Sequence, residues 1–343
     1  MNFSTESSTI NSTLESYFPG EIYFLRLISK VQAYFLDVSP ITFVFGSVWN
    51  SLIIIYFMKV HRKKLVKMNS YHFLIINLAV TDLFVTVGAP IFASNFYKRS
   101  SWELGDFGCR FFFPFFAKVC PTVSCWLLVL ISYARYRSIV HPLRAKINKM
   151  KYCLVCIWLW VLGILSNIYL FMNVALKERR SMTVCAFTGK YQHNIIYQAV
   201  NYVLESFLPL GIMLSLYYRM KRTMTAQERE NPFLLSERIR QRNQTALKTI
   251  RGLIFLFAAT TVPVRICNIF ILTISLLSYH SDLNFYRIYS RYFLLVFFFS
   301  KFVFYLNNAL NIFIYAKMIP GFREFLWPVI TFGCRKRRNA ANE

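Results

Sequence analysis

The chain has 343 residues, of which 56% are hydrophobic and 16% are charged, and its formal net charge is +25. About a quarter of the residues of a soluble domain are charged, so this composition argues against a soluble protein and favours a membrane protein. The basic residues flank long apolar runs and form no patch on a polar surface, which argues against nucleic-acid binding.

Seven apolar stretches are each long enough to cross a bilayer as an α-helix, which needs about 20 residues. In chain order they are Ser39–Met58, His72–Phe96, Phe111–Ala134, Tyr152–Leu176, Asn194–Tyr218, Gly252–Ser278 and Tyr292–Ala316. The longest connection runs from Arg219 to Arg251, too short for a separate folded domain. We therefore predict an all-α membrane protein, a seven-transmembrane helix bundle at residues 38–316 between an N-terminal tail (1–37) and a C-terminal segment (317–343).

The distribution of Lys and Arg predicts the orientation of the bundle, because cytoplasmic connections carry an excess of basic residues. Basic clusters fill alternate connections, namely Lys59–Lys67, Arg135–Lys151, Arg219–Arg251 and Lys317–Arg338. We therefore expect a multi-pass protein of the cell membrane with its N-terminus outside. Asn2 and Asn11 then lie in extracellular N-glycosylation sequences. The polar start of the chain predicts no cleavable signal peptide.

Two cysteines are expected outside the cell, Cys109 at the start of the third span and Cys185 in the loop after the fourth. Extracellular conditions are oxidising, so we predict a disulfide between them. Five other cysteines lie within the spans, where a thiol behaves as a small apolar group.

Ionisable side chains interrupt the apolar spans at five positions, namely Asp82, Lys118, Glu205, Arg265 and Lys301. A charge at membrane depth costs about 2.5 kcal/mol or more, so each must face the bundle interior or a wet cavity. Asn307, Asn311 and Tyr315 recur every four residues and form one polar face of the seventh helix. A sodium ion is a candidate for the pocket formed by Asp82, Ser124, Asn307 and Asn311, and we expect no other cofactor.

Short motifs occur on the spans in a fixed order. They are Gly46–Asn50 on the first, Asn77–Asp82 on the second, Trp102 before the third, Ala134-Arg135-Tyr136 at its end, Trp160 on the fourth, Pro209 and Tyr217 on the fifth, Phe257 and Pro263 on the sixth, and Asn311–Tyr315 on the seventh. In this order and spacing the chain resembles the rhodopsin-like (class A) family of G-protein-coupled receptors over nearly its whole length. The resemblance implies a signalling receptor rather than an enzyme.

The resemblance also implies roles for residues near the cytoplasmic face, where a heterotrimeric G protein would bind. The residues expected in coupling and activation are Arg135, Tyr136, Tyr217, Phe257, Asn311 and Tyr315. Beyond the seventh span, Phe322, Phe325, Leu326 and Val329 form an apolar stripe at helical spacing, which predicts a C-terminal amphipathic helix in the membrane interface. Cys334 in the basic tail is a candidate lipidation site.

The chain departs from the family pattern at three switch positions. Ala134 replaces the acidic residue that normally precedes Arg135, and Asn243 occupies the sixth-helix position that can pair with it. We therefore expect no ionic restraint on Arg135 and elevated basal signalling. Thr261 replaces the sixth-helix tryptophan, and Ile312 the proline of the seventh-helix motif.

The third span departs from the family pattern in its length. It contains one residue more between Cys109 and Arg135 than the family spacing has. The extra residue predicts a local bulge in this helix near Pro114 or Pro121.

Three cations and one carboxylate fall in the middle or outer half of the bundle, where this family binds ligands. One interpretation is that Lys118, Arg265 and Lys301 attract an anionic ligand, either a peptide or a small molecule. The other is that Glu205 and Arg265 pair with each other internally. By the resemblance, the position of the amine-binding aspartate of relatives falls at Phe116 or Ala117, depending on the extra residue, and that of the retinal-binding lysine falls at Tyr305. An amine salt bridge and a retinal Schiff base are therefore not expected, and Phe116 and Tyr305 are candidate contacts for another ligand.

Two other functions remain compatible with these features. A receptor-shaped decoy or scavenger would bind the ligand without coupling, which Ala134 favours. A secondary transporter would also contain buried charges, but transporters usually show internal repeats and broken helix pairs, which this sequence lacks.

Overall fold

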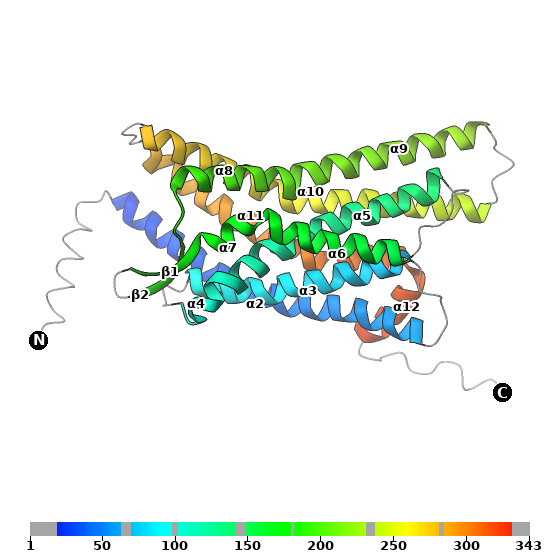
Figure 1. Cartoon of the computed structure of the whole chain (residues 1–343), viewed down its shortest axis with the longest axis horizontal. Helices are drawn as coiled ribbons and strands as arrows, with labels where there is room; N and C mark the ends of the chain where they lie inside the picture. Colours follow the sequence, from blue (N-terminus) through cyan, green and yellow to red (C-terminus); the bar gives the residue numbers. More distant parts are fainter. Residues whose placement is uncertain are drawn as a thin grey trace, which may run out of the picture.

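The computed structural model of the chain describes residues 19–62, 70–97, 102–141, 149–179, 182–230, 237–280 and 285–330. Almost all of these residues are helical, and Figure 1 shows the long helices lying side by side in one bundle. The first three long elements are α2 (Pro19–Arg62), α3 (Ser70–Tyr97) and the run α4 (Gly105–Phe107), η1 (Gly108–Phe112), η2 (Phe115–Val119) and α5 (Cys120–Val140). α2 begins twenty residues before the predicted span (39 − 19 = 20), so part of the predicted N-terminal tail is helical.

The fourth predicted span, Tyr152–Leu176, is wrong at its end. α6 (Lys149–Ser166) stops before Asn167, α7 (Ile168–Met172) adds about one turn, and β1 (Val174–Arg179) follows. Asn167 causes the break, because its backbone N–H bonds to the carbonyl of Ile164 (3.1 Å), three residues back, and its side chain donates to the carbonyl of Gly163 (2.9 Å). Asn side chains can bond to nearby backbone groups and so compete with the backbone hydrogen bonds of a helix.

An antiparallel hairpin, which the sequence did not predict, covers one end of the bundle. β1 pairs with β2 (Met182–Phe187), with Leu176 opposite Cys185. The fifth span then consists of α8 (Tyr191–Tyr202), the π-helical turn η3 (Val203–Phe207) and α9 (Leu208–Glu230).

The connection predicted between Arg219 and Arg251 is largely helical. α9 continues to Glu230 and α10 (Glu237–His280) starts seven residues later (237 − 230 = 7), so both helices extend past the apolar region. The seventh long helix is α11 (Phe285–Met318), and α12 (Pro320–Ile330) follows it as the predicted C-terminal helix. Phe322 and Leu326 of α12 are buried, and the Phe322 ring packs edge-on against Tyr56 of α2 (5.1 Å between centroids).

Five helices in the described residues are long and apolar enough to cross a membrane, and the bent pair α11 and α12 could make a sixth. They are Thr42–Arg62, Tyr71–Gly88, Gly105–Val140, Gln192–Arg229 and Ile239–Phe270. α6 is apolar from Met150 to Ser166 but shorter than a typical span. Together with α6 and α11, these helices correspond to the seven predicted spans.

The third span contains the helical irregularity that its extra residue predicts. Two π-helical turns, η1 and η2, lie on either side of Pro114, which confirms the predicted bulge. A π-helical turn accommodates one extra residue and changes the direction of the side chains on either side of it. The bundle core then forms mainly between α2, α3, α5, α9, α10 and α11.

Candidate functional site

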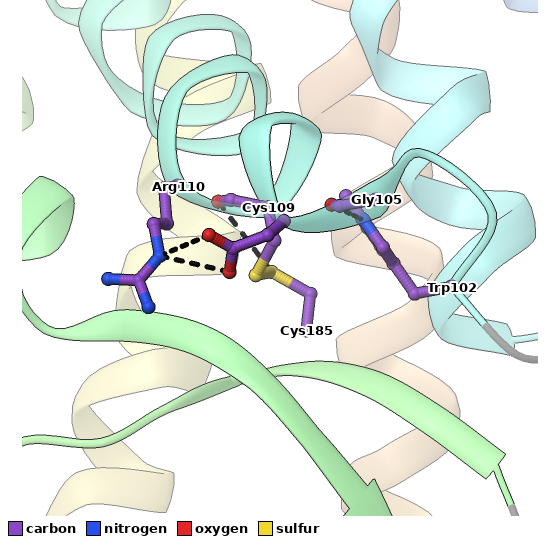
Figure 2. The surroundings of a disulfide bond; sticks show 6 residues. Trp102, Gly105, Cys109, Arg110 and Cys185 are labelled. Atoms are coloured by element: carbon purple, nitrogen blue, oxygen red, sulfur yellow. Dashed lines mark hydrogen bonds and ion pairs between the residues drawn. A yellow bond between two sulfur atoms is a disulfide. The ribbon is translucent and has the colours of Figure 1, made fainter.

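The Cys109–Cys185 disulfide, which the sequence predicted, joins η1 to β2 (S–S 2.05 Å) and fixes the hairpin over one end of the bundle (Figure 2). Trp102 lies beside it and donates from its indole nitrogen to the carbonyl of Gly105 (2.9 Å). Gly105 has a φ of 64°, in the left-handed region that glycine adopts without a steric penalty. We call this end of the bundle the disulfide end.

A buried ion pair lies midway along the third span and joins the fifth and sixth spans. The Arg265 guanidinium of α10 contacts the Glu205 carboxylate of η3 at 2.9 Å, and the two side chains are 7% and 3% exposed. Two hydroxyls complete it: Thr122 of α5 donates to Glu205 Oε1 (2.8 Å), and Arg265 Nε donates to Ser206 Oγ (2.8 Å). The interpretation in which Glu205 and Arg265 pair internally is therefore the one that the structure shows.

The hydrogen bonds of this ion pair continue into the fourth span. Asn167 Nδ2 lies 3.4 Å from Thr122 Oγ1, and Tyr197 of α8 donates its hydroxyl to Asn167 Oδ1 (2.8 Å). The rings of Tyr202 and Phe304 lie 5.3 Å and 5.5 Å from Arg265 Cζ. We call Glu205, Arg265, Thr122, Ser206 and Asn167 the central network. It connects four spans, the third to the sixth, at one depth.

Lys118 lies one helical turn closer to the disulfide end than Thr122. Its side chain is partly exposed and interacts electrostatically with both Glu205 and Arg265. Within the described residues these are two cations against one carboxylate, and no carboxylate forms a close ion pair with Lys118. This leaves a local positive charge beside the central network, on the side of the disulfide end.

The other predicted ligand contacts have different surroundings. Phe116 packs in the cluster under the disulfide and its ring meets Phe84 edge-on (6.2 Å). The ring of Tyr305 lies 5.7 Å from that of Phe304, the neighbouring residue on α11, and it is Phe304 whose ring faces Arg265. The side chain of Lys301 is outside the described residues, as are Asn2, Asn11 and Cys334.

The polar pocket around Asp82 lies further from the disulfide end. Ser124 Oγ donates to Asp82 Oδ1 (2.6 Å) and Asn311 Nδ2 donates to Asp82 Oδ2 (2.7 Å), so the structure brings these three predicted residues together. Asn307 instead accepts a bond from Thr260 through Oδ1 (3.0 Å) and shows no bond to Asp82. Both carboxylate oxygens are thus engaged by protein donors, and a sodium site at this carboxylate stays a prediction.

A small cavity of about 20 Å³ lies between the central network and the Asp82 pocket, which is room for about one water. Its lining includes Ser124, Glu205, Arg265 and Asn307. Thr261 also lines it, and its hydroxyl is buried without a hydrogen-bond partner among the described residues. Thr261 replaces the family tryptophan, so a small side chain with a hydroxyl lines the cavity here in place of an indole ring.

Arg135 lies at the opposite end of the third span, which we call the Arg135 end. Its guanidinium stacks on the ring of Tyr71 of α3 (3.5 Å to the centroid), and its Nε has no hydrogen-bond partner among the described residues. No acidic side chain in that part of the chain forms an ion pair with it. Among the described residues, the close contact of the Arg135 guanidinium is therefore with an aromatic ring, and the expectation of elevated basal signalling stays a prediction.

The remaining predicted coupling residues have different surroundings, and Phe257 lines the small cavity beside the central network. Tyr136 stacks with Tyr133 (6.3 Å), whereas Phe257 and Tyr315 are buried. The Tyr315 hydroxyl has no partner among the described residues. Tyr217 is partly buried on α9 and packs against the core.

Sequence reasoning missed several residues of these sites, namely Thr122, Ser206, Asn167 and Tyr71. Asn167 had a detectable signal, because it is an amide inside a long apolar run. Thr122 follows Lys118 at the helical spacing of four residues, which places both on one face. The stacking of Arg135 on Tyr71 has no sequence signal, because it depends on how α3 and α5 pack.

The comparisons with known proteins agree with this architecture. Residues 49–315 match the family model described as 7 transmembrane receptor (rhodopsin family). The chain therefore belongs to the rhodopsin family of seven-transmembrane receptors, which makes it a multi-pass membrane protein and a receptor rather than an enzyme.

Three relatives show how distant the similarity is. The type-1 angiotensin II receptor of Meleagris gallopavo is 23% identical over 345 aligned residues, covering 96% of this chain and 88% of the relative. Hydroxycarboxylic acid receptor 3 of Homo sapiens is 29% identical over 174 residues, 50% of this chain and 43% of the relative. A tachykinin-like peptides receptor of Drosophila melanogaster is 25% identical over 277 residues, 77% of this chain and 52% of the relative.

Proposed function

We propose that this receptor lies in the cell membrane with the disulfide end outside, binds an extracellular ligand with an anionic group, and activates a heterotrimeric G protein. The ligand is a peptide with a free carboxylate or a small organic acid. The orientation rests on the Lys and Arg of the connections, which gather at the Arg135 end. A disulfide at the opposite end agrees with an oxidising exterior.

The observation that carries the ligand class is the charge balance around Lys118. Arg265 already neutralises Glu205, and Lys118 adds a second cation one turn nearer the outside. An anion that enters from the disulfide end would meet Lys118 before the central network. A charged group in a low-dielectric cleft attracts opposite charge strongly. Two of the relatives, named for angiotensin II and for a hydroxycarboxylic acid, are compatible with ligands that carry carboxylates.

The experiment is a screen of the full chain, expressed in cells, against organic acids and peptides. Each peptide is supplied with a free C-terminus and as its amide, and G-protein activation is the readout. We expect responses to carboxylates only, and a potency loss of about tenfold or more in Lys118→Gln, in line with a lost hydrogen bond to a charged group. Lys177→Gln is the control, since Lys177 is exposed on β1 at the same end. Equal potency of acid and amide, or of Lys118→Gln and wild type, contradicts the anionic ligand.

G-protein coupling is supported by the position of Arg135, whose guanidinium stacks on Tyr71 and forms no ion pair with a carboxylate among the described residues. The same feature favours the decoy function, because a receptor without the usual acidic neighbour of this arginine could bind without coupling. Ligand binding with no activation in a panel of G proteins would identify a decoy. Activation that Arg135→Ala abolishes, while ligand binding is retained, identifies a coupled receptor.

A further inference from the structure

We propose that Tyr71 positions Arg135 in the signalling-inactive state of the receptor, by holding its guanidinium against the Tyr71 ring. The guanidinium carbon of Arg135 lies 3.5 Å from the centroid of this ring. Ala134 and Asn243 leave Arg135 without the acidic partners of the family pattern, so the ring is the group that restrains it. The signalling consequence rests on the proposed G-protein coupling, whereas the contact itself does not.

The buried face of α3 places Tyr71 at the Arg135 end. Tyr71 lies in the first turn of α3, and Leu74, Ile75 and Leu78 follow it by three, four and seven residues. Residues at these spacings share one face of a helix. All three are fully buried, so Tyr71 is the last side chain on the face that α3 turns toward the core.

The buried face of α5 places Arg135 in the same way. Leu128, Ile131 and Ser132 precede Arg135 by seven, four and three residues, and each of the three is buried. α3 and α5 pack against each other in the bundle core. Two buried faces therefore end in a ring on one helix and a guanidinium on the other, and helix packing brings the two groups together.

The chemistry of this contact suits a restraint that can be released. The face of an aromatic ring attracts a guanidinium within about 6 Å, and Arg135 lies well inside this limit. A ring face does not satisfy the N–H donors, and Arg135 Nε is buried without a hydrogen-bond partner among the described residues. A buried donor without a partner is unfavourable. Arg135 can therefore leave the ring when a hydrogen-bond acceptor arrives at the Arg135 end.

Tyr71 also connects Arg135 to the seventh span. Tyr315 of α11 is 1% exposed and interacts electrostatically with Tyr71, and its hydroxyl has no hydrogen-bond partner among the described residues. Tyr71 thus lies beside two residues that the family resemblance assigns to coupling, one on α5 and one on α11. A movement of either helix would change the contact between Tyr71 and Arg135.

The first test separates a charge–ring attraction from simple packing. Phenylalanines with one, two or three ring fluorines are introduced at position 71 of the full chain, with Tyr71→Phe as the reference, and the Tm of the purified receptor is measured. Fluorine withdraws electron density from the ring face and so weakens its attraction for a cation, with little change of shape. We expect Tm to fall with each added fluorine.

The same series is then measured in an Arg135→Leu background, where no guanidinium faces the ring. We expect Tm there to be independent of the number of fluorines, because the two changes act on one contact. Equal slopes in the two backgrounds would mean that Tyr71 only fills space, and would overturn the proposal.

The second test measures basal G-protein activation at matched surface expression. We expect Tyr71→Leu to raise it about two- to fivefold over Tyr71→Phe, the range for a cation over a ring, with the fluorinated variants between them in order. Tyr133→Leu is the control, since the Tyr133 ring is 37% exposed on α5 and stacks on Tyr136 instead. An equal rise in the control, or basal activation that does not follow the fluorine number, would overturn the role of Tyr71.

The two tests distinguish failure of this inference from failure of the proposed function, because Tm needs no G protein. A Tm that follows the fluorine number in a receptor that activates no G protein would support the position of Arg135 on Tyr71 and contradict coupling. A Tm that ignores the fluorine number in a signalling receptor would overturn the contact and leave coupling intact.

Discussion

Arg265 and Arg135 both project from helices of the bundle, but their guanidinium groups meet opposite surroundings. Arg265 is buried, contacts a carboxylate and donates to a hydroxyl, and its network reaches four spans. Arg135 stacks on one ring, and its Nε has no hydrogen-bond partner in the part of the chain that the structure describes. The comparison teaches that the buried ion pair between helices lies at mid-depth in the described part of this receptor, between the fifth and sixth spans, rather than at Arg135.

The largest effect is expected from Glu205→Gln, which leaves the buried Arg265 charge uncompensated. Removing one partner of a buried pair costs about 3–5 kcal/mol. Thermal unfolding of the solubilised receptor should therefore show a large fall in Tm. The double change with Arg265→Gln should cost less than the sum of the two single changes, because no charge is then left alone. Additive losses would mean that the pair does not couple the two helices.

Thr122→Val should have the next largest effect, because it keeps the shape of the side chain and removes the hydroxyl that donates to Glu205 (2.8 Å). A hydrogen bond to a charged group contributes about 1.5–3 kcal/mol. Thr273→Val is the control, since the Thr273 hydroxyl bonds only to the helix backbone at an exposed position. A Tm change no larger than that of the control would show that Thr122 does not support the pair.

The difference between the two arginines also shows which features a sequence can predict. Apolar length, basic connections and motif order predicted the seven spans, the disulfide and a shared pocket for Asp82, Ser124 and Asn311, because each depends on one helix or on the family pattern. The extra residue between Cys109 and Arg135 predicted a bulge near Pro114 or Pro121 for the same reason, and π-helical turns lie on either side of Pro114.

The partners of the charged residues could not be predicted, because they depend on the rotation of neighbouring helices. Glu205 could have met Arg265, Lys118 or a ligand, and only the packing of η3 against α10 decides this. The predicted end of the fourth span was wrong because the Asn167 side chain donates to the carbonyl of Gly163 and α6 stops there. The length of an apolar run does not indicate such a bond. Lys301 and Cys334 stay predictions.

Ala134→Asp should bring the Arg135 end closer to the family pattern by placing a carboxylate beside Arg135. An exposed or partly exposed ion pair contributes up to about 1 kcal/mol, which corresponds to about a fivefold shift in a two-state equilibrium. Basal second-messenger levels should therefore fall by up to this factor, whereas the uncharged Ala134→Asn should leave them unchanged. Basal levels of the unmodified receptor no higher than those of mock-transfected cells would contradict the expectation of elevated basal signalling.

The smallest effect is expected from Glu228→Gln, at a second ion pair between the fifth and sixth spans. Glu228 of α9 and Arg240 of α10 lie 3.3 Å apart, but their side chains are 35% and 41% exposed, against 3% and 7% for Glu205 and Arg265. Water and salt screen such a pair, so its loss should cost at most about 0.5 kcal/mol and should vanish at high salt. Glu205→Gln should keep its full effect at the same salt concentration. A fall in Tm for Glu228→Gln as large as for Glu205→Gln would mean that the two helices are held as firmly at their exposed ends as at the central network.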